Sequence, residues 1–414
     1  MKKVIEMSFH EGTVLKIYPS DAQKRIIAVN DGAFRSVYNF LVASDREIHQ
    51  LEKTGIYIRT VRERIDYLRK ATKSASYIAN ALPYLKEKSV DSQAVANAIQ
   101  NYHKAWKDMK ENHCGIPTFH RKGYAQSYQT NAHYNKGAED IGDCNVRFED
   151  EHHITLPKLG RIRCDGSPEI VRSLMNRENT RIGTITVSRD AVGEYWASLQ
   201  ISSDIAFHEP LPKTGSSVGI DLNLIDLVND SEGNAYENQR FRRKAQKKLA
   251  KAQRRMSRKA ERARKEKRPL RTSQNYQKER RRAAFIARKT ARQRNDYLNC
   301  LSKHLVKSHD LIAAEKLNVR NLLKNHCLAS SISDAAWSKF LRMTEYKADM
   351  YGKKVILVAP QYTTQTCSVC GYVMKGREKL PLSVREWNCP SCGAHHVRDV
   401  NAARNILKKA LESL

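Results

Sequence analysis

Three acidic residues lie inside or beside apolar segments, where a carboxylate is unfavourable. Asp221 lies within residues 218–222, which predict a buried strand, and Glu315 ends a second apolar strand at residues 311–315. Asp399 begins a predicted helix whose apolar side chains recur every three or four residues. A buried charge is costly unless a partner compensates it. Three converging carboxylates suit Mg²⁺, and two such ions about 3.5–4 Å apart would bind the attacking and leaving oxygens of a phosphodiester.

Each carboxylate taken alone also has a simpler explanation. Asp399 fits a helix N-cap, Glu315 an ordinary strand end, and Asp221 an ion pair with a buried arginine. Residues 354–359 predict a further buried strand, after a helix that begins near residue 331. Strand, helix and strand around acidic residues are the layout of an RNase H-like α/β core. The order strand-Asp, strand-Glu, helix-Asp favours one shared metal site over three unrelated side chains.

Four of the nine cysteines form two C-x-x-C pairs with 18 residues between them, and each pair is followed by glycine. The pairs are Cys367 with Cys370 and Cys389 with Cys392. This spacing predicts a zinc ribbon, in which four thiolates hold one structural Zn²⁺ and leave no position open for water. Two disulfides are the alternative. The other five cysteines have no framework spacing, which favours a reducing cytosol and therefore zinc.

The chain is strongly basic, with 74 Lys and Arg against 44 Asp and Glu and a formal net charge of +30. A charge of this size indicates a polyanionic partner, either nucleic acid or an anionic membrane. No apolar run reaches the roughly 18–20 residues that a spanning helix needs, and the first residues lack a signal-peptide core. Nucleic acid is therefore the expected partner, without a membrane, in the cytoplasm.

Most of the excess charge lies in residues 240–294, which hold 25 Lys and Arg and three Glu. Their pattern predicts a helical hairpin with a turn near Pro269. A solvated helix face is the alternative, but ion pairs one turn apart cannot neutralise this excess, so a bound polyanion is favoured. We expect nucleic-acid contacts from the basic residues of this stretch, among them Arg242, Arg243, Lys247, Arg254 and Arg255.

The first half of the chain combines predicted strands with a helical block. Short alternating segments at residues 12–19, 153–156, 161–164, 184–188 and 195–201 predict a small β-barrel. Helical patterns between residues 21 and 114 predict an insertion after the first strand. Aromatic and basic residues alternate after residue 115, which suits stacking on bases but also a half-buried strand. They include Arg121, Lys122, Tyr124 and Tyr128.

The chain resembles the TnpB family of insertion-sequence nucleases. Three features carry the resemblance: the Asp/Glu/Asp set split along the chain, the zinc ribbon before Asp399, and residues 362–367, which lead into the ribbon. The resemblance implies a multi-domain α+β protein with a RuvC-like nuclease core and an inserted zinc ribbon. It implies a β-barrel wedge domain at residues 1–20 and 115–212, a helical recognition lobe at 21–114, the nuclease core at 213–361 with the basic hairpin at 240–294, the zinc ribbon at 362–396 and a final RuvC-like segment at 397–414.

The same resemblance implies a transposon-associated, RNA-guided DNA endonuclease. Its partners would be a guide RNA and a double-stranded DNA target, in a monomeric ribonucleoprotein. Catalysis would depend on Mg²⁺ held by Asp221, Glu315 and Asp399. Contacts to a short motif beside the target would fall near Ser92, Gln93 and Thr130. A compact type V CRISPR effector shares this core, and a nuclease-inactive RNA-guided repressor would normally lack one of the three carboxylates.

The basic hairpin generates the first testable prediction. Changing Arg242, Arg243 and Lys247 to glutamate should weaken nucleic-acid binding to all sequences alike, because phosphate contacts carry no sequence information. The slope of log affinity against log salt should fall by about one for each lost contact. Filter binding at several salt concentrations measures both quantities. An unchanged slope would show that the hairpin is a solvated face.

Overall fold

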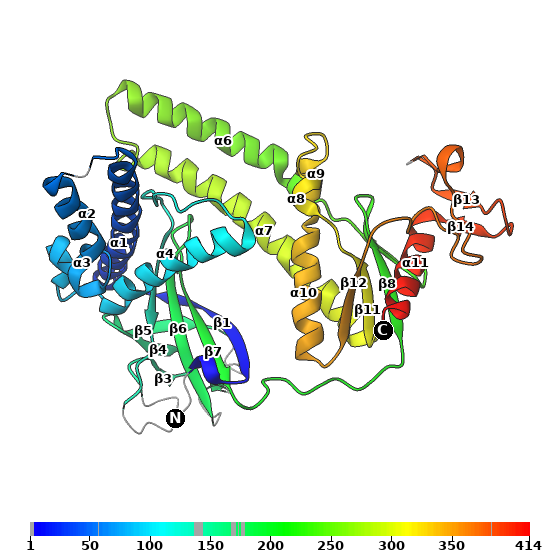
Figure 1. The fold of residues 1–414 in the computed structure, drawn as a ribbon, viewed down its shortest axis with the longest axis horizontal. Helices are drawn as coiled ribbons and strands as arrows, with labels where there is room; N and C mark the ends of the chain where they lie inside the picture. Colours follow the sequence, from blue (N-terminus) through cyan, green and yellow to red (C-terminus); the bar gives the residue numbers. More distant parts are fainter. Residues whose placement is uncertain are drawn as a thin grey trace. The chain divides into compact units, whose positions relative to one another are not determined.

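The computed structural model describes residues 4–56, 58–135, 144–166, 171–172, 174, 179–381 and 383–414. The chain divides into two compact units, residues 1–207 and 208–414, which are described separately (Figure 1). Among the described residues, no helix combines the length and the apolar character needed to cross a membrane. The mixture of helices and sheets in each unit confirms the α+β class.

The first unit contains a seven-stranded sheet in the order β2-β6-β7-β1-β5-β4-β3, with antiparallel pairing throughout. Leu15 and Ile17 of β1 face the core while Val14 and Tyr18 on either side are exposed, which is the alternation expected of a half-buried strand. The edge strands β2 and β3 do not pair with each other among the described residues, so closure into a barrel remains a prediction. The strands are β1 (Phe9–Tyr18), β2 (Gln126–Asn131), β3 (Arg147–Asp150), β4 (His153–Leu156), β5 (Gly160–Asp165), β6 (Thr180–Arg189) and β7 (Tyr195–Ser203).

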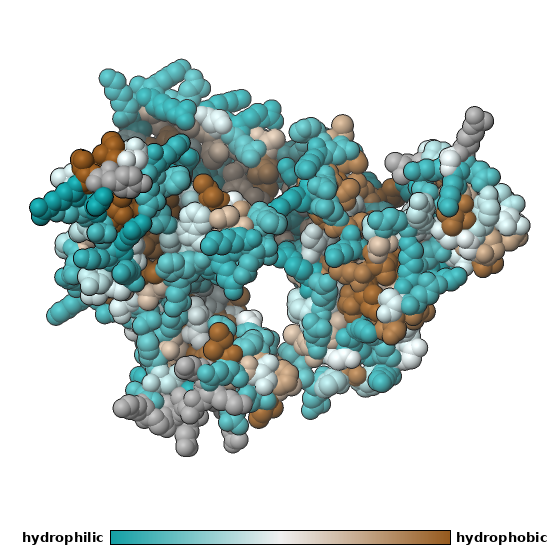
Figure 2. Space-filling model, in the orientation of Figure 1, coloured by the Kyte–Doolittle hydropathy of each residue, from teal (hydrophilic) through white to brown (hydrophobic). Residues whose placement is uncertain are grey.

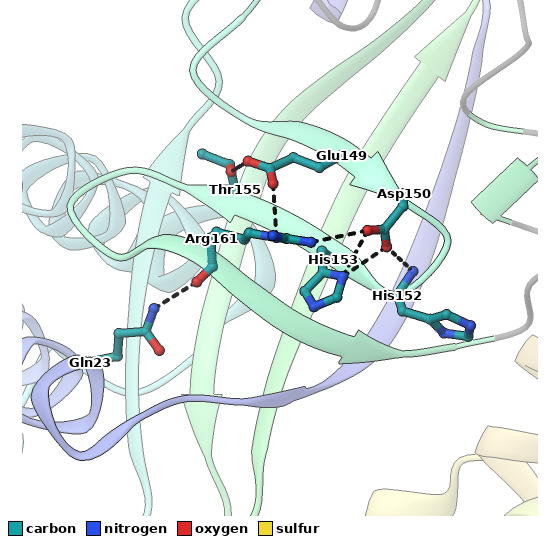
Figure 3. Close-up of polar contacts among 7 residues, drawn as sticks. All are labelled: Gln23, Glu149, Asp150, His152, His153, Thr155 and Arg161. Carbon is teal, nitrogen blue, oxygen red and sulfur yellow. Dashed lines mark hydrogen bonds and ion pairs between the residues drawn. The ribbon is translucent and has the colours of Figure 1, made fainter.

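Helices occupy the chain between β1 and β2. They are α1 (Asp21–Lys53), α2 (Arg59–Ala71), α3 (Ala75–Ala81) and α4 (Ser92–Asn112), and a 3₁₀ turn follows α3 at Pro83–Lys86. Ser20 and Gln23 form a capping box at the start of α1, as their spacing predicts. The amide of Gln23 also donates to the carbonyls of Leu159 and Arg161, which fixes the start of α1 to the sheet (Figure 3).

The turn between β3 and β4 is held by a polar cluster beside that contact (Figure 3). Asp150 accepts from the backbone N–H of His152 and lies 2.8 Å from Nδ1 of His153, and the first contact is the main reason why the pKa of Asp150 lies below its usual value. Arg161 of β5 bridges Asp150 and Glu149. These groups are exposed, so the cluster orders a hairpin and contributes little to stability.

The second unit contains a mixed five-stranded sheet in the order β10-β9-β8-β11-β12. The central strand β8 runs parallel to β11, which runs parallel to β12, whereas β9 and β10 are antiparallel additions. The strands are β8 (Ser217–Leu222), β9 (Asp226–Asp230), β10 (Ala235–Glu237), β11 (Leu311–Glu315) and β12 (Lys354–Val358). Every residue of β11 is buried, as expected of a strand whose two faces are both covered by helices.

Two layers of helices cover this sheet, and Figure 1 shows α10 and α11 on opposite sides of it. Leu301 and Leu305 of α7 (Gln274–Ser308) pack with Phe340 of α10 (Trp337–Met350) against one face. On the other face, Ile406 and Ala410 of α11 (Arg398–Glu412) pack against β11 and β12. The short helices α8 (Val319–Leu322) and α9 (Ala329–Ala335) lie between β11 and α10 in the chain.

The basic stretch folds as two long helices, α6 (Phe241–Lys265) and α7, joined by a turn after Pro269. The buried side chains of the α6–α7 pair include the small alanines Ala252, Ala260, Ala263 and Ala283. Alanine allows two helices to pack closely but buries little apolar area, so this pairing leaves the lysines and arginines in solvent. Figure 2 shows a mostly hydrophilic surface over α6.

The packing of α11 on β8 depends on Gly219. A Cβ built at this position would lie 2.0 Å from the carbonyl oxygen of Ala403 and 2.9 Å from the backbone nitrogen of Leu407. Both contacts are with helix backbone, which cannot rotate away as a side chain would. Only glycine therefore allows α11 to lie this close to the central strand.

This contact generates the second prediction. Gly219→Ala should push α11 away from β8 and lower Tm by about 4–8 °C, from a cost of about 2 kcal/mol. Gly12→Ala is the matched control, because a Cβ at Gly12 meets nothing within 4 Å. Calorimetry of both variants measures the difference. Equal Tm values for the two variants would contradict the close packing described here.

Candidate metal centres and nucleic-acid surfaces

Asp221 and Glu315 lie at the same edge of the second sheet. Asp221 lies near the end of β8, and Glu315 is the last residue of β11. The two strands are parallel neighbours with Ala314 opposite Ile220, so the register places Glu315 beside Asp221. Both residues are buried, at 7% and 9% exposure. The carboxyl ends of parallel strands commonly form ligand sites in α/β folds.

Asp399 reaches the same region from α11, where it lies in the first turn. Its side chain is 15% exposed, and Nη1 of Arg385 lies 3.3 and 3.4 Å from its two oxygens. The backbone N–H of Arg398 donates to the carbonyl of Arg385 at 2.7 Å, which ties the start of α11 to an earlier segment of the ribbon. The N-cap position itself is Val397, so Asp399 does not cap the helix.

The electrostatics show that Glu315 and Asp399 act on Asp221. Burial, followed by the negative charges of Glu315 and Asp399, raises the pKa of Asp221 to about 7. Burial also raises the pKa of Glu315, and Thr363 Oγ1, which donates to Glu315 at 2.5 Å, counteracts it. Without a cation, the site thus concentrates negative charge where solvation is poor. Oxygen donors in this state fit a hard divalent cation.

The four cysteines form a tighter cluster. Among the described residues, they are the one group of three or more His, Cys, Asp or Glu side chains whose donor atoms all lie within 4.8 Å of one another. Cys367 Sγ lies 3.7 Å from Cys392 Sγ, and Cys370 Sγ lies 3.6 Å from Cys389 Sγ. Two thiolates bound to one tetrahedral Zn²⁺ at about 2.3 Å would be about 3.8 Å apart. The sulfur spacing therefore fits a tetrahedral metal.

Both cysteine pairs have the same backbone turn. The N–H groups of Cys367 and Cys389 each donate to the carbonyl five residues later, and Gly371 and Gly393 each donate back to the cysteine carbonyl four residues earlier. Both glycines have φ near +75°, at +78° and +72°, a conformation that side chains other than glycine rarely adopt. The backbone N–H of Tyr372 also lowers the pKa of Cys370. The glycine that follows each C-x-x-C pair in the sequence is therefore the residue that permits the turn.

The structure separates the predicted nucleic-acid contacts into two groups. Exposed side chains are available for contact: Ser92, Arg121, Lys122, Arg242, Arg243, Lys247, Arg254 and Arg255. Gln93 and Tyr124 are half-buried. Tyr128 and Thr130 are buried, at 1% and 0% exposure, because they are on the core-facing side of β2. A direct contact was the wrong prediction for both, since Tyr128 packs in the core and Thr130 donates to Asp91, the N-cap of α4.

A row of amide side chains between α4 and β2 was missed. Asn97 donates to the carbonyl of Gln129, and Asn101 donates to its side-chain oxygen. Asn131 donates to Gln93 and accepts from Thr184 of β6. The residues Gln93, Asn97 and Asn101 follow one another at four-residue spacing on α4, a signal that was present in the sequence. Such a row offers hydrogen-bond donors and acceptors with little charge.

A cavity of about 660 Å³ opens at the start of α6 and is lined by Arg240, Arg242 and Arg243. The α6 helix has no side-chain cap of its own. Instead, the backbone N–H of Arg242 donates to the buried carboxylate of Asp334, which also lines the cavity. The side chain of Arg294 lies 3.7 Å from the same carboxylate. Asp334 therefore anchors the first turn of the basic hairpin.

Comparison with known proteins places these sites in context. Residues 197–326 match the family model described as Probable transposase, and residues 337–406 match the one described as Cas12f1-like, TNB domain. A Streptomyces pristinaespiralis protein, provisionally named an RNA-guided DNA endonuclease, is 43% identical over 229 residues, which are 55% of this chain and 53% of that protein. Escherichia coli K12 InsQ, with the same provisional name, is 28% identical over 392 residues, 91% of this chain and 86% of InsQ.

A protein of Acanthamoeba polyphaga mimivirus that is named TnpB-like is 38% identical over 119 residues, 27% of this chain and 22% of that protein. The chain is similar to proteins named RNA-guided DNA endonuclease and TnpB-like. This confirms the resemblance that the sequence motifs indicate, although the alignment spans only about half the length of the Streptomyces protein.

The fold of the chain also has a relative among solved structures. A chain of the Cas12f1-sgRNA-target DNA complex superposes with a TM-score of 0.52 at 13% identity, covering 96% of this chain and 98% of that chain. At this identity the likeness concerns the fold alone. It extends over both units, including the regions outside the two matched family models.

The buried carboxylate generates the third prediction. Asp221 has a pKa near 7 in the folded protein but about 3.9 when unfolded, so its ionisation opposes folding increasingly as the pH rises from about 4 to 7. In EDTA at pH 8, Asp221→Asn should therefore raise Tm by at least about 3 °C, and at pH 4 it should have almost no effect. Asp349→Asn, which removes an exposed carboxylate of α10, is the control. A Tm gain that is independent of pH would contradict this electrostatic account.

Proposed function

We propose that this chain is a TnpB-like, RNA-guided DNA endonuclease that hydrolyses phosphodiesters at a site made of Asp221, Glu315 and Asp399. The observation that carries the proposal is the approach of Glu315 of β11 and Asp399 of α11 to the buried Asp221 of β8, whose pKa their charges help to raise. The names of the Streptomyces and Escherichia coli relatives support both the RNA guidance and the DNA substrate.

We assign the second unit to a RuvC-like nuclease, with the core at residues 213–361 and a final segment at 397–414. Three features support this assignment. Numbered along the chain, the strands lie in the order 3-2-1-4-5, with the second antiparallel to the first, an order typical of RNase H-like folds. Two acidic residues end parallel strands, and the third lies on a helix packed against them. The cysteine cluster, within residues 362–396, lies between β12 and α11 in the chain.

Asp221, Glu315 and Asp399 would hold Mg²⁺, which we propose as two ions. Bound Mg²⁺ would supply Lewis-acid stabilisation of the phosphate and a more acidic water. The protein's own contribution is to prepare the ligands. Thr363 donates to one oxygen of Glu315, and Arg385 holds Asp399 beside the site. Burial leaves the charge of Asp221 poorly solvated. Each of these makes the site ready for a cation before one arrives.

The four cysteines would hold one structural Zn²⁺. The donor set is all sulfur, the spacing fits tetrahedral coordination, and no ligand position remains for water. The ribbon supplies Arg385 and leads directly into α11, so the metal would steady the segment that carries Asp399. In the proposed function it is a structural ion and takes no part in the reaction.

Two surfaces are proposed to bind nucleic acid. The exposed lysines and arginines of α6 would hold phosphates through charge alone. In the first unit, residues 21–114 are proposed as a recognition lobe, and residues 1–20 with 115–212 as a wedge domain. The half-buried amides of Gln93, Asn101 and Gln129 suit base edges, because side-chain amides pair with adenine. Asn97 is buried and holds the backbone of Gln129 in place. A short DNA motif would be read here while the guide RNA pairs with the rest of the target.

The partners of the proposed enzyme are a guide RNA and double-stranded DNA, in a monomeric cytoplasmic ribonucleoprotein encoded by a mobile element. A compact type V CRISPR effector would share the fold, and RNA that copurifies with the chain would distinguish the two. Transcript from the flank of its own gene would support the transposon assignment, whereas array-derived RNA would support the CRISPR effector.

The fourth prediction tests the carboxylates as one unit. Asp221→Ala, Glu315→Ala and Asp399→Ala should each reduce cleavage of a guide-matched plasmid at least about a thousandfold, since each removes a metal ligand. Target binding in a gel-shift assay should persist, and the α10 surface variant Asp349→Ala should cut normally. Near-normal cutting by any of the three variants, or wild-type cutting in excess EDTA, would rule out the assignment. Cutting that is equally fast without guide RNA would rule out guidance.

A further inference from the structure

His396 lies beside the cysteine cluster without being one of the four sulfur donors. It is 2% exposed, and its Nε2 lies 3.0 Å from Cys367 Sγ. Its ring is held over Trp387 with centroids 4.6 Å apart, because the two residues are paired across β13 (Glu386–Asn388) and β14 (His395–Val397). The burial and fixed orientation of this imidazole make its short contact with Cys367 specific.

The distance distinguishes a ligand from a hydrogen-bond donor. Sulfur and imidazole nitrogen bound to the same tetrahedral zinc would be about 3.6 Å apart, given bond lengths of about 2.3 and 2.0 Å. The 3.0 Å between Nε2 and Cys367 Sγ is shorter than that, whereas the sulfur pairs Cys367–Cys392 and Cys370–Cys389 match the tetrahedral spacing. His396 is therefore placed to hydrogen-bond to a ligand and not to replace one.

The protonation of the ring follows from its surroundings. A zinc-bound thiolate has no proton to donate, so the hydrogen of the Nε2–Sγ contact must come from the imidazole. Nδ1 is buried and has no hydrogen-bond partner among the residues that the structure describes, so a proton there would be left unsatisfied. Both facts favour the tautomer that carries its hydrogen on Nε2.

We propose that His396 is a positioning residue of the zinc site, whose Nε2–H donates to the Cys367 thiolate. Four thiolates around Zn²⁺ leave a net charge of −2, and a donor to sulfur offsets part of it. Cys367 is also buried, so solvent compensates little of its charge. The contact further links the metal to β14, which is followed directly by Arg398 and Asp399 of α11.

This inference rests on zinc binding by the four cysteines, which is part of the proposed function. It is tested with the full-length zinc protein, in which His396→Leu removes the donor and His396→Gln keeps an amide N–H of similar reach. His395→Leu is the matched control, because the neighbouring side chain is 60% exposed. Zinc affinity is measured by chelator competition, and the thiolate-to-metal charge-transfer band is measured after replacement of Zn²⁺ by Co²⁺.

We expect His396→Leu to bind zinc about 10–100-fold more weakly and to shift the charge-transfer band to lower energy, since the sulfur lone pairs lose a stabilising hydrogen. His396→Gln should recover most of the affinity and the band position, and His395→Leu should match wild type. Equal losses in the Leu and Gln variants without a band shift would overturn the inference and indicate packing alone. Wild-type affinity in His396→Leu would overturn it while leaving the zinc site intact. Wild-type protein that binds no zinc would overturn both.

Discussion

The close contact of α11 with β8 is the interaction on which the candidate centre depends. Asp221 and Glu315 are brought together by strand pairing, which is local to the sheet and would form without the last helix. Asp399 arrives only because α11 lies against the central strand, where Gly219 leaves room for the backbone of Ala403 and Leu407. A missing Cβ on one strand therefore determines whether the third carboxylate reaches the other two.

The same arrangement is unfavourable for the folded chain until a cation binds. Asp221 is buried among negative neighbours, and the pKa near 7 measures how strongly the protein resists its ionisation. The apolar packing of β11 with Leu305 and Phe340 stabilises the fold and offsets this unfavourable ionisation. Arg385 of the ribbon partly neutralises the negative charge of the site through its ion pair with Asp399. A site with stored repulsion of this kind is expected where function requires a ligand that stability does not.

How much of this could be predicted from the sequence differs between the two units. The carboxylates and the cysteine pairs stand out because a charge in an apolar strand and a C-x-x-C spacing each have few explanations. The helical insertion after β1 and the capping box of Ser20 and Gln23 followed from periodicity and local pairing. These features depend on neighbours close in sequence. Contacts between segments far apart in the chain could not be predicted in the same way.

The incorrect predictions for Tyr128 and Thr130 show why such contacts could not be predicted. Tyr128 and Thr130 lie among basic and aromatic residues, and only the pairing of β2 with β6 determines that both face the core. A shift of one residue in that register would have exposed them. The helical spacing of Gln93, Asn97 and Asn101 is visible in the sequence, but the contact of this amide row with β2 is not, and neither is the contact of His396 with Cys367. Tertiary register, which no local pattern encodes, decided each case.

The central claim is that Asp221, Glu315 and Asp399 form one cation site, and direct metal binding tests it without any assumption about RNA or DNA. Mn²⁺ can replace Mg²⁺ and is counted from the loss of its free-ion EPR signal. The account predicts saturable binding to the zinc-loaded wild-type chain and an affinity at least about tenfold lower in each of Asp221→Asn, Glu315→Gln and Asp399→Asn. Binding that is unchanged in all three variants would contradict the account.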